Sequence, residues 1–196
     1  MSAQRLTVLV DACSLVPPLT RNVMLSLAEG DLFRLRWSAA ILAEVERAIA
    51  TSFAKKGVLD GDERAAKACA AMERAFEDAN VIGFEALIPT LGCLPDPGDA
   101  HVIAAAVKTR ASLIVTENLR HFPKRVLMPF DLEAKRADTF IAEAVEIDPD
   151  RAVLAIRRMR ERFRRPEMTA KILLQKMEQS GLMQTAAALR NHGSSL

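Results

Sequence analysis

The sequence is short of cysteine, has little net charge and contains no long hydrophobic run, and each shortage excludes a class of protein. Cys13, Cys69 and Cys93 are odd in number and widely spaced, so they form neither a disulfide framework nor a zinc-binding pattern. No apolar run approaches about 18 residues, and the N-terminus lacks the hydrophobic segment of a signal peptide. The net charge of +2 does not by itself indicate a nucleic-acid partner. We therefore expect a cytoplasmic protein with no membrane span.

What the sequence does contain is enough apolar residues for a substantial core, since 50% of the chain is hydrophobic. From residue 6 to 128, short apolar runs typical of strands alternate with longer stretches of helical period. The expected strands are 6–10, 33–37, 81–82, 112–115 and, at an edge, 126–128; the expected helices are 18–29, 39–50, 62–79 and a segment from residue 100. This alternation predicts a mostly parallel sheet covered on both faces, which is an α/β architecture.

The pattern changes after residue 131, where it becomes helical throughout. Asp148 is placed to cap a helix that begins at Pro149, and Pro166 and Gly181 divide the rest into about three helices. We therefore divide the chain into a first domain, 1–130, and a helical C-terminal extension, 131–196.

The most informative stretch is 94–106, in which Asp96 and Asp99 precede a run too apolar to lie in water. Pro97 and Gly98 predict a tight turn, and Asp99 stands where a helix N-cap is expected. The helix that follows is apolar nearly all round, so it should pack inside the protein. Acidic residues at the start of a buried helix, close to the exit of a buried strand, suggest a metal site.

Other polar residues also stand at strand exits or near helix starts. Asp11 ends the first strand, Thr116 and Asn118 follow the strand 112–115, and Glu44 lies on the helix that Ser38 should cap. In a parallel sheet such ends lie along one edge, where ligands bind. Each residue also has a purely structural interpretation, as the cap of a turn (Asp11), a turn residue (Thr116) or a surface acid (Glu44).

Several carboxylates brought within a few Å of one another repel and raise each other's pKa values unless a cation neutralises them. Oxygen ligands without a histidine or cysteine cluster favour magnesium or manganese over zinc. Such an ion can activate a water and stabilise the leaving oxygen of a phosphodiester.

Four segments, taken together and in this order, resemble the PIN domain, and in particular its VapC-like branch of toxin ribonucleases. They are Val10–Cys13 (VDAC), Trp37–Glu44 (WSAAILAE), Leu94–Ala106 (LPDPGDAHVIAAA) and Ile114–Pro123 (IVTENLRHFP). The resemblance covers about residues 6–128. The helical remainder is similar to the C-terminal extension that one subgroup of these toxins carries.

The resemblance implies a three-layer α/β/α fold and an Mg2+- or Mn2+-dependent endoribonuclease that hydrolyses RNA phosphodiester bonds. It also implies a type II toxin that is restrained by a cognate antitoxin and that commonly dimerises. The residues that match the family's acidic positions are Asp11, Glu44 and Asp99. Asp96 is a further acid that we expect to help hold the metal. Thr116 and Asn118 match the fourth motif and are expected to orient the remaining side of the site.

The sequence departs from the family pattern at several positions. Many members have an aspartate where Asn118 stands, and close relatives often have an acid at the position of His121. An aspartate is also common at the positions of Gly98 and Asn22, and an arginine at that of Ala100. These departures bear on metal affinity and rate more than on fold. They leave open the alternative of a degenerate PIN domain that binds RNA or a protein partner without cleavage.

Two other enzyme classes fit the first strand less well. A phosphatase of the dehalogenase type needs a second acid where Cys13 stands, and a Rossmann protein needs a glycine-rich turn there. A housekeeping role in RNA processing stays open. The basic run 157–165 has three interpretations, namely a solvated helix face, a contact with RNA phosphates and a dock for an acidic antitoxin segment. Apolar residues of the C-terminal helices could also bury against a second copy.

Overall fold

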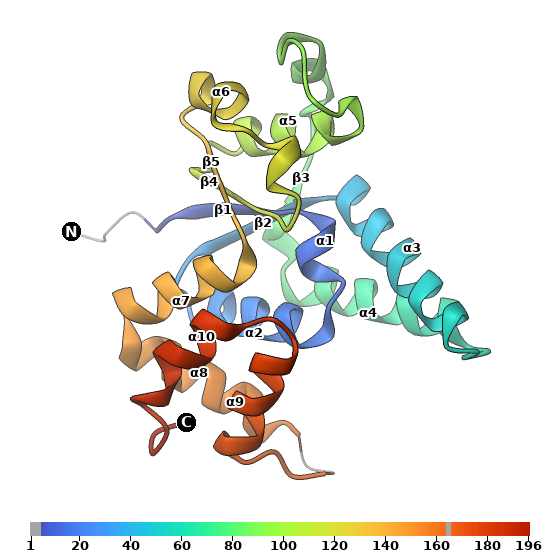
Figure 1. The fold of residues 1–196 in the computed structure, drawn as a ribbon. Coiled ribbons are helices and arrows are strands. Elements are labelled where there is room, and N and C mark those ends of the chain that lie inside the picture. Colours follow the sequence, from blue (N-terminus) through green and yellow to red (C-terminus); the bar gives the residue numbers. More distant parts are fainter. Residues whose placement is uncertain (1–4, 164–165) are drawn as a thin grey trace.

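The computed structural model describes residues 5–163 and 166–196, and this part of the chain forms one parallel sheet with helices around it (Figure 1). The strands are β1 (Thr7–Val10), β2 (Arg34–Ser38), β3 (Asn80–Val81), β4 (Leu113–Val115) and β5 (Glu133–Lys135). Their order across the sheet is β3-β2-β1-β4-β5, and every neighbouring pair is parallel. The predicted parallel α/β sheet is therefore confirmed.

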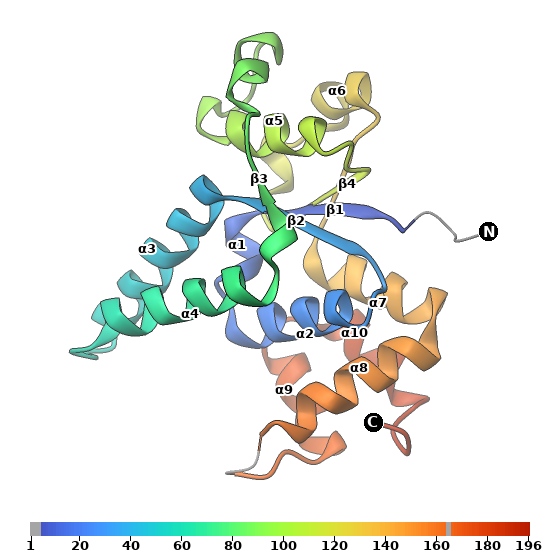
Figure 2. The same cartoon turned by 180° about the vertical axis from the view of Figure 1, so that it is seen from behind.

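Helices cover both faces of this sheet, which confirms the predicted layers (Figures 1 and 2). They are α1 (Ala12–Leu15), α2 (Pro18–Glu29), α3 (Ala39–Lys55), α4 (Gly61–Ala75), α5 (Ala100–Lys108), α6 (Lys124–Leu127), α7 (Ala137–Ile147), α8 (Pro149–Glu161), α9 (Ala170–Gln179) and α10 (Met183–Arg190). Helix α5 lies on one face, and α1, α2 and α7 lie on the other. Helices α3 and α4 pack against each other beside the sheet.

The apolar pattern of the sequence explains which elements are central. Val8, Leu9 and Val10 of β1 are fully buried, as expected for the middle strand of a covered sheet. Residues 102–106 of α5 are also fully buried, so this helix forms the core of its layer. In β2, buried Leu35 and Trp37 alternate with more accessible arginines, as the sequence predicted.

The expected edge strand at 126–128 is wrong. Residues 124–127 form α6, and residues 128–130 form a short 3-10 turn. A three-residue apolar run fits either a strand or one buried helical turn, and Pro123 at the N-cap favours the helix here. The edge strand is β5, whose backbone pairs with β4 through Glu133 N to Ser112 O (3.1 Å) and Thr116 N to Lys135 O (2.9 Å).

Strand β5 lies beyond residue 130, where we divided the chain on sequence grounds. A division at 130 would remove this strand from its sheet, so we now propose a boundary between residues 136 and 137. The predicted helix at 62–79 also ends early, because α4 stops at Ala75 and a 3-10 turn follows it.

The C-terminal helices pack closely against the sheet domain. Phe140 of α7 meets Phe33 edge to face, with ring centroids 4.9 Å apart, and α8 packs on α2. The carboxylate of Asp138 accepts hydrogen bonds from the backbone N–H groups of Gln184 and Thr185, both 2.9 Å long, at the start of α10. Among the described residues, no helix is long and apolar enough to cross a membrane.

Most of the apolar residues that could have served a second copy are buried within the chain itself, namely Leu173, Met177, Leu182 and Leu189. In the basic run, Arg157 pairs with Glu161 on the same helix, and Arg162 pairs with Glu29 of α2 at 2.8 Å. Arg164 and Arg165 lie outside the described residues.

Candidate metal centre

The first part of the candidate site lies where two neighbouring strands end. Val10 of β1 is paired with Val115 of β4, so the next residues, Asp11 and Thr116, leave the sheet side by side. The Thr116 hydroxyl donates a 2.7 Å hydrogen bond to Asp11 Oδ2. Asp11 is only 7% exposed and Thr116 is fully buried, so this contact is held firmly at the edge of the sheet.

Cys13 is a further partner of Asp11 that sequence reasoning did not assign to the site. Its thiol donates to Asp11 Oδ2 at 3.0 Å, and its sulfur accepts from the Glu117 backbone N–H at 3.1 Å. Burial raises the pKa of the Cys13 thiol to about 11, and the charge of Asp11 adds to this shift. The thiol therefore keeps its proton and acts as a donor. The only sequence signal was its position two residues after Asp11.

The structural interpretation of Asp11 also holds, because its other oxygen, Oδ1, accepts from the Ala12 backbone N–H at 2.8 Å. Asp11 thus caps α1 through Oδ1, while Thr116 and Cys13 donate hydrogen bonds to its Oδ2. These contacts fix the plane of the carboxylate.

A second group forms at the start of α5. Asp99 was expected to cap this helix, but its side chain makes no capping hydrogen bond. Its Oδ2 lies 2.7 Å from His121 Nδ1, and Asp96 Oδ2 lies 3.5 Å from the same nitrogen. Asp96 caps the preceding turn instead, through Gly98 N at 2.8 Å. A side chain at Gly98 would place its Cβ 3.1 Å from Asp96 Oδ1, so glycine leaves room for this carboxylate.

Glu44 reaches the site from α3 and is half-buried there. His101 Nε2 lies 3.5 Å from Glu44 Oε1, while His101 Nδ1 lies 2.8 Å from the Gly98 carbonyl. Because a carbonyl can only accept, the His101 proton belongs on Nδ1 in this arrangement. Sequence reasoning did not count His101 as catalytic, and the structure places it beside Glu44.

The four carboxylates act on one another electrostatically. Desolvation raises the pKa of Glu44; His101 opposes this shift, and the charges of Asp11 and Asp99 add to it. Desolvation likewise raises the pKa of Asp99; His121 lowers it, while Asp11 and Asp96 raise it further. Such mutual repulsion is what a bound cation relieves. The oxygen-rich donor set therefore fits a hard divalent ion.

These acids do not all meet at one point. Asp96, Asp99 and His121 each offer a donor atom within 4.8 Å of the other two. Asp11 and Glu44 lie outside this closest group and affect it through their charge. The ligand set predicted from sequence is thus split, and His121, which was not among the predicted ligands, belongs to the closest group.

Asn118 contacts His121 rather than a carboxylate. Its Nδ2 lies 2.7 Å from His121 Nδ1, and its backbone N–H donates to the Thr116 hydroxyl at 3.1 Å. Arg120 Nε lies 3.1 Å from both Asn118 Oδ1 and His121 Nε2. This exposed arginine brings a positive charge to the rim of the site, and sequence reasoning missed it.

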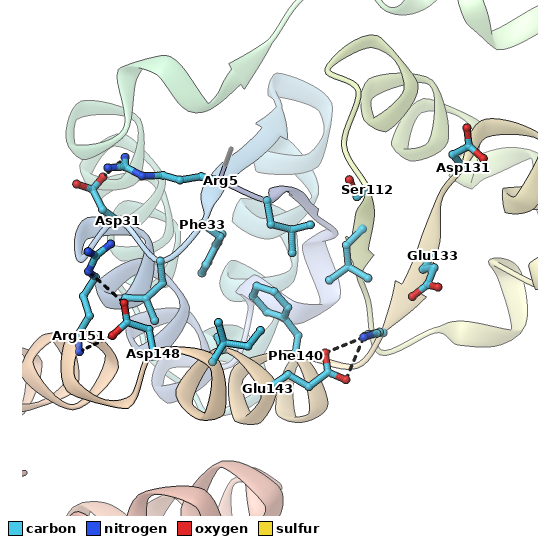
Figure 3. A pocket seen from close by; sticks show the side chains of 16 residues that line it. Arg5, Asp31, Phe33, Ser112, Asp131, Glu133, Phe140, Glu143, Asp148 and Arg151 are labelled. Atoms are coloured by element: carbon cyan, nitrogen blue, oxygen red, sulfur yellow. Dashed lines mark hydrogen bonds and ion pairs between the residues drawn. The ribbon is translucent and has the colours of Figure 1, made fainter. Parts of the chain in front are cut away.

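A separate cavity of about 680 Å3 lies among the starts of the strands, away from these acids (Figure 3). Phe33 and Phe140 line it, and two ion pairs flank it, Arg5 with Asp31 and Lys135 with Glu143. None of the predicted site residues lines this cavity.

Comparison with known proteins identifies the family of the chain. The PIN domain family model matches residues 7–120, and the model of the VapC50 C-terminal domain matches residues 137–191. A protein of Mycobacterium tuberculosis, described as "Putative ribonuclease VapC50", is 37% identical over 76 residues, which cover 39% of this chain and 45% of that protein. No solved structure matches the chain. Together, the four motifs, the parallel sheet and the family models show that the chain belongs to the PIN domain family, with a VapC50-type C-terminal extension.

Proposed function

We propose that this protein is a divalent-metal-dependent endoribonuclease, the toxin of a type II toxin–antitoxin pair, which hydrolyses RNA phosphodiester bonds. The observation that carries the proposal is the close group of donor atoms from Asp96, Asp99 and His121, with Asp11 and Glu44 linked to Asp99 through their charge. A bound cation would relieve the repulsion between these acids, and the description of the mycobacterial relative supports RNA as substrate.

The proposed roles follow from the contacts. Asp11, Glu44, Asp96 and Asp99 would hold Mg2+ or Mn2+, which when bound supplies a Lewis acid and an activated water. Thr116 and Cys13 keep the Asp11 carboxylate in one orientation. Asn118 orients the side of the site next to His121. Arg120 is exposed at the rim, where its guanidinium can bind a phosphate of the RNA.

The partners are also part of the proposal. An antitoxin would restrain the nuclease, and the expected compartment is the cytoplasm, where thiols stay reduced. For a homodimer, the exposed apolar residues of the C-terminal helices are the proposed contact, namely Leu154, Ile172 and Met183, which are 46%, 38% and 58% exposed.

The test compares wild type, Asp11→Asn and Asp99→Asn by calorimetry with Mg2+ and Mn2+, followed by RNA cleavage with the same preparations. We expect metal binding and metal-dependent cleavage in wild type and the loss of cleavage in both variants. Asp150→Asn, which removes one exposed acid on α8, is the matched control and should behave like wild type. If wild type bound no ion at millimolar metal, the protein would instead be a PIN domain that binds RNA or a partner without cleavage.

A further inference from the structure

His121 is partly buried, and its neighbours are two carboxylates, those of Asp96 and Asp99. Its side chain is 20% exposed, and those of Asp99 and Asp96 are 23% and 45% exposed. We propose that His121 is a ligand of the divalent ion, and that this nitrogen makes the site prefer Mn2+ over Mg2+. This inference rests on the proposed metal-dependent function and adds the identity of the ion.

The distances suit ligands of one ion. Adjacent ligands of a six-coordinate ion with bonds of about 2.1 Å lie about 3.0 Å apart. His121 Nδ1 lies 2.7 Å from Asp99 Oδ2 and 3.5 Å from Asp96 Oδ2, values on either side of that spacing. The imidazole nitrogen that faces the acids is therefore already placed as a third donor, and only small side-chain shifts are needed.

The proton of the imidazole sets one condition on this arrangement. Arg120 Nε faces His121 Nε2 and Asp99 Oδ2 faces Nδ1, and both contacts favour a proton on Nδ1, whereas the Asn118 amide, whose Nδ2 lies 2.7 Å from Nδ1, can donate only to an Nδ1 without a proton. An ion bound to Nδ1 requires the proton on Nε2, so Arg120 must then turn away and the Asn118 amide must give up its contact with Nδ1. Because Arg120 and its contacts are exposed, its movement breaks no buried hydrogen bond, and it leaves the guanidinium free for a phosphate.

The preference for manganese follows from ligand chemistry. Mg2+ is bound by carboxylates, phosphates and water in a strict octahedron and keeps most of its waters. Imidazole is a ligand of first-row transition ions, and replacing one acid with a neutral imidazole also removes a negative charge that would attract Mg2+. His121 therefore lowers the affinity of the site for Mg2+ more than it lowers the affinity for Mn2+.

Pulsed electron paramagnetic resonance of bound Mn2+ tests this directly, because a coordinated imidazole nitrogen gives a resolved 14N coupling. The chain has three histidines, so each can be changed alone, as His101→Gln, His121→Asp and His192→Gln, in protein without a polyhistidine tag. We expect the coupling in wild type, His101→Gln and His192→Gln, and its loss in His121→Asp.

Calorimetry of the same proteins measures the preference. We expect wild type to bind Mn2+ at least roughly tenfold more tightly than Mg2+, a ratio of the size that changes around metal ligands produce. His121→Asp should bring the two affinities together. Should His121→Asp fail to fold, His121→Asn removes the imidazole without adding a charge and takes its place.

Two outcomes overturn the inference in distinguishable ways. Mn2+ that binds and supports RNA cleavage without a nitrogen coupling, or with one that survives in His121→Asp, refutes His121 as a ligand and leaves the proposed function intact. A folded wild type that binds neither ion refutes the proposed metal-dependent function, and the inference fails with it.

Discussion

The hydroxyl of Thr116 offers the sharpest test of how the site is built. It is fully buried, donates to Asp11 Oδ2 at 2.7 Å and accepts from the Asn118 backbone N–H at 3.1 Å. Thr116→Val preserves the shape of the side chain but removes the hydroxyl. Thr116→Ser is the matched control, because it keeps the hydroxyl and removes one methyl group.

The contacts give the magnitude of the effect. A hydrogen bond to a charged group contributes about 1.5–3 kcal/mol, and leaving the Asn118 N–H without a partner adds up to about 1 kcal/mol. We therefore expect Thr116→Val to lower the free energy of unfolding by about 2–4 kcal/mol. Thr116→Ser should cost about 1 kcal/mol, the transfer free energy of one buried methyl group with a small cavity term.

Urea unfolding, followed by circular dichroism in EDTA, measures both values. With an m-value of roughly 2 kcal/mol/M, the midpoint of Thr116→Val should fall by about 1–2 M and that of Thr116→Ser by about 0.5 M. RNA cleavage should be close to wild type in Thr116→Ser and reduced in Thr116→Val, since Oδ2 of Asp11 is then held only by the weak thiol donor of Cys13. Equal stability and equal cleavage in the two variants would refute the assignment of Thr116 as the residue that holds Asp11.

Three further predictions test the electrostatics and the packing. Because desolvation raises the pKa of Glu44, the folded state holds a proton that the unfolded state releases, so metal-free stability falls as pH rises through the folded pKa. Glu44→Gln should therefore flatten this fall in urea unfolding as the pH rises above 4.5, the ordinary pKa of the carboxyl, and an unchanged slope would contradict the electrostatic argument. The raised pKa of Cys13 leaves about one thiol in a thousand ionised at pH 8, so iodoacetamide should label exposed Cys93 first, as peptide mass spectrometry would show; faster labelling of Cys13 would contradict its buried, protonated state. Asp138→Ala removes the cap of α10 and should lower stability by about 1–2 kcal/mol, while Asp150→Ala, an exposed acid, should change it by less than about 0.5 kcal/mol, and equal losses would show that the cap contributes nothing.

Much of this arrangement follows from local patterns in the sequence. The alternation of strands and helices predicts the parallel sheet, and a parallel sheet places the residues after β1 and β4 at one edge. The sequence alone therefore predicts that Asp11 and Thr116 lie side by side. The sequence also predicts Ser38 as the N-cap of α3. The structure confirms it, because the Ser38 hydroxyl accepts a hydrogen bond from the Ile41 backbone N–H.

Other features depend on contacts that no local pattern encodes. Strand β5 reads Glu-Ala-Lys, which has neither an apolar run nor alternation, and only its backbone pairing with β4 makes it a strand. The pairing of His121 with Asp99 depends on the path of the turn after Thr116. The same pairing explains why Asp99, in a good position to cap α5, turns its carboxylate into the site instead.

The contact of Phe140 with Phe33 has a consequence for what happens when the gene is damaged. Phe140 belongs to the C-terminal extension, yet it packs on a residue that leads into β2, so the extension forms part of the hydrophobic core of the first domain. A frameshift after the last PIN motif would leave every acidic residue of the candidate site encoded but would expose this aromatic surface to water. We expect such a truncated product to aggregate or be degraded, so that a truncating mutation in the final third of the gene silences the protein as fully as a substitution of Asp11.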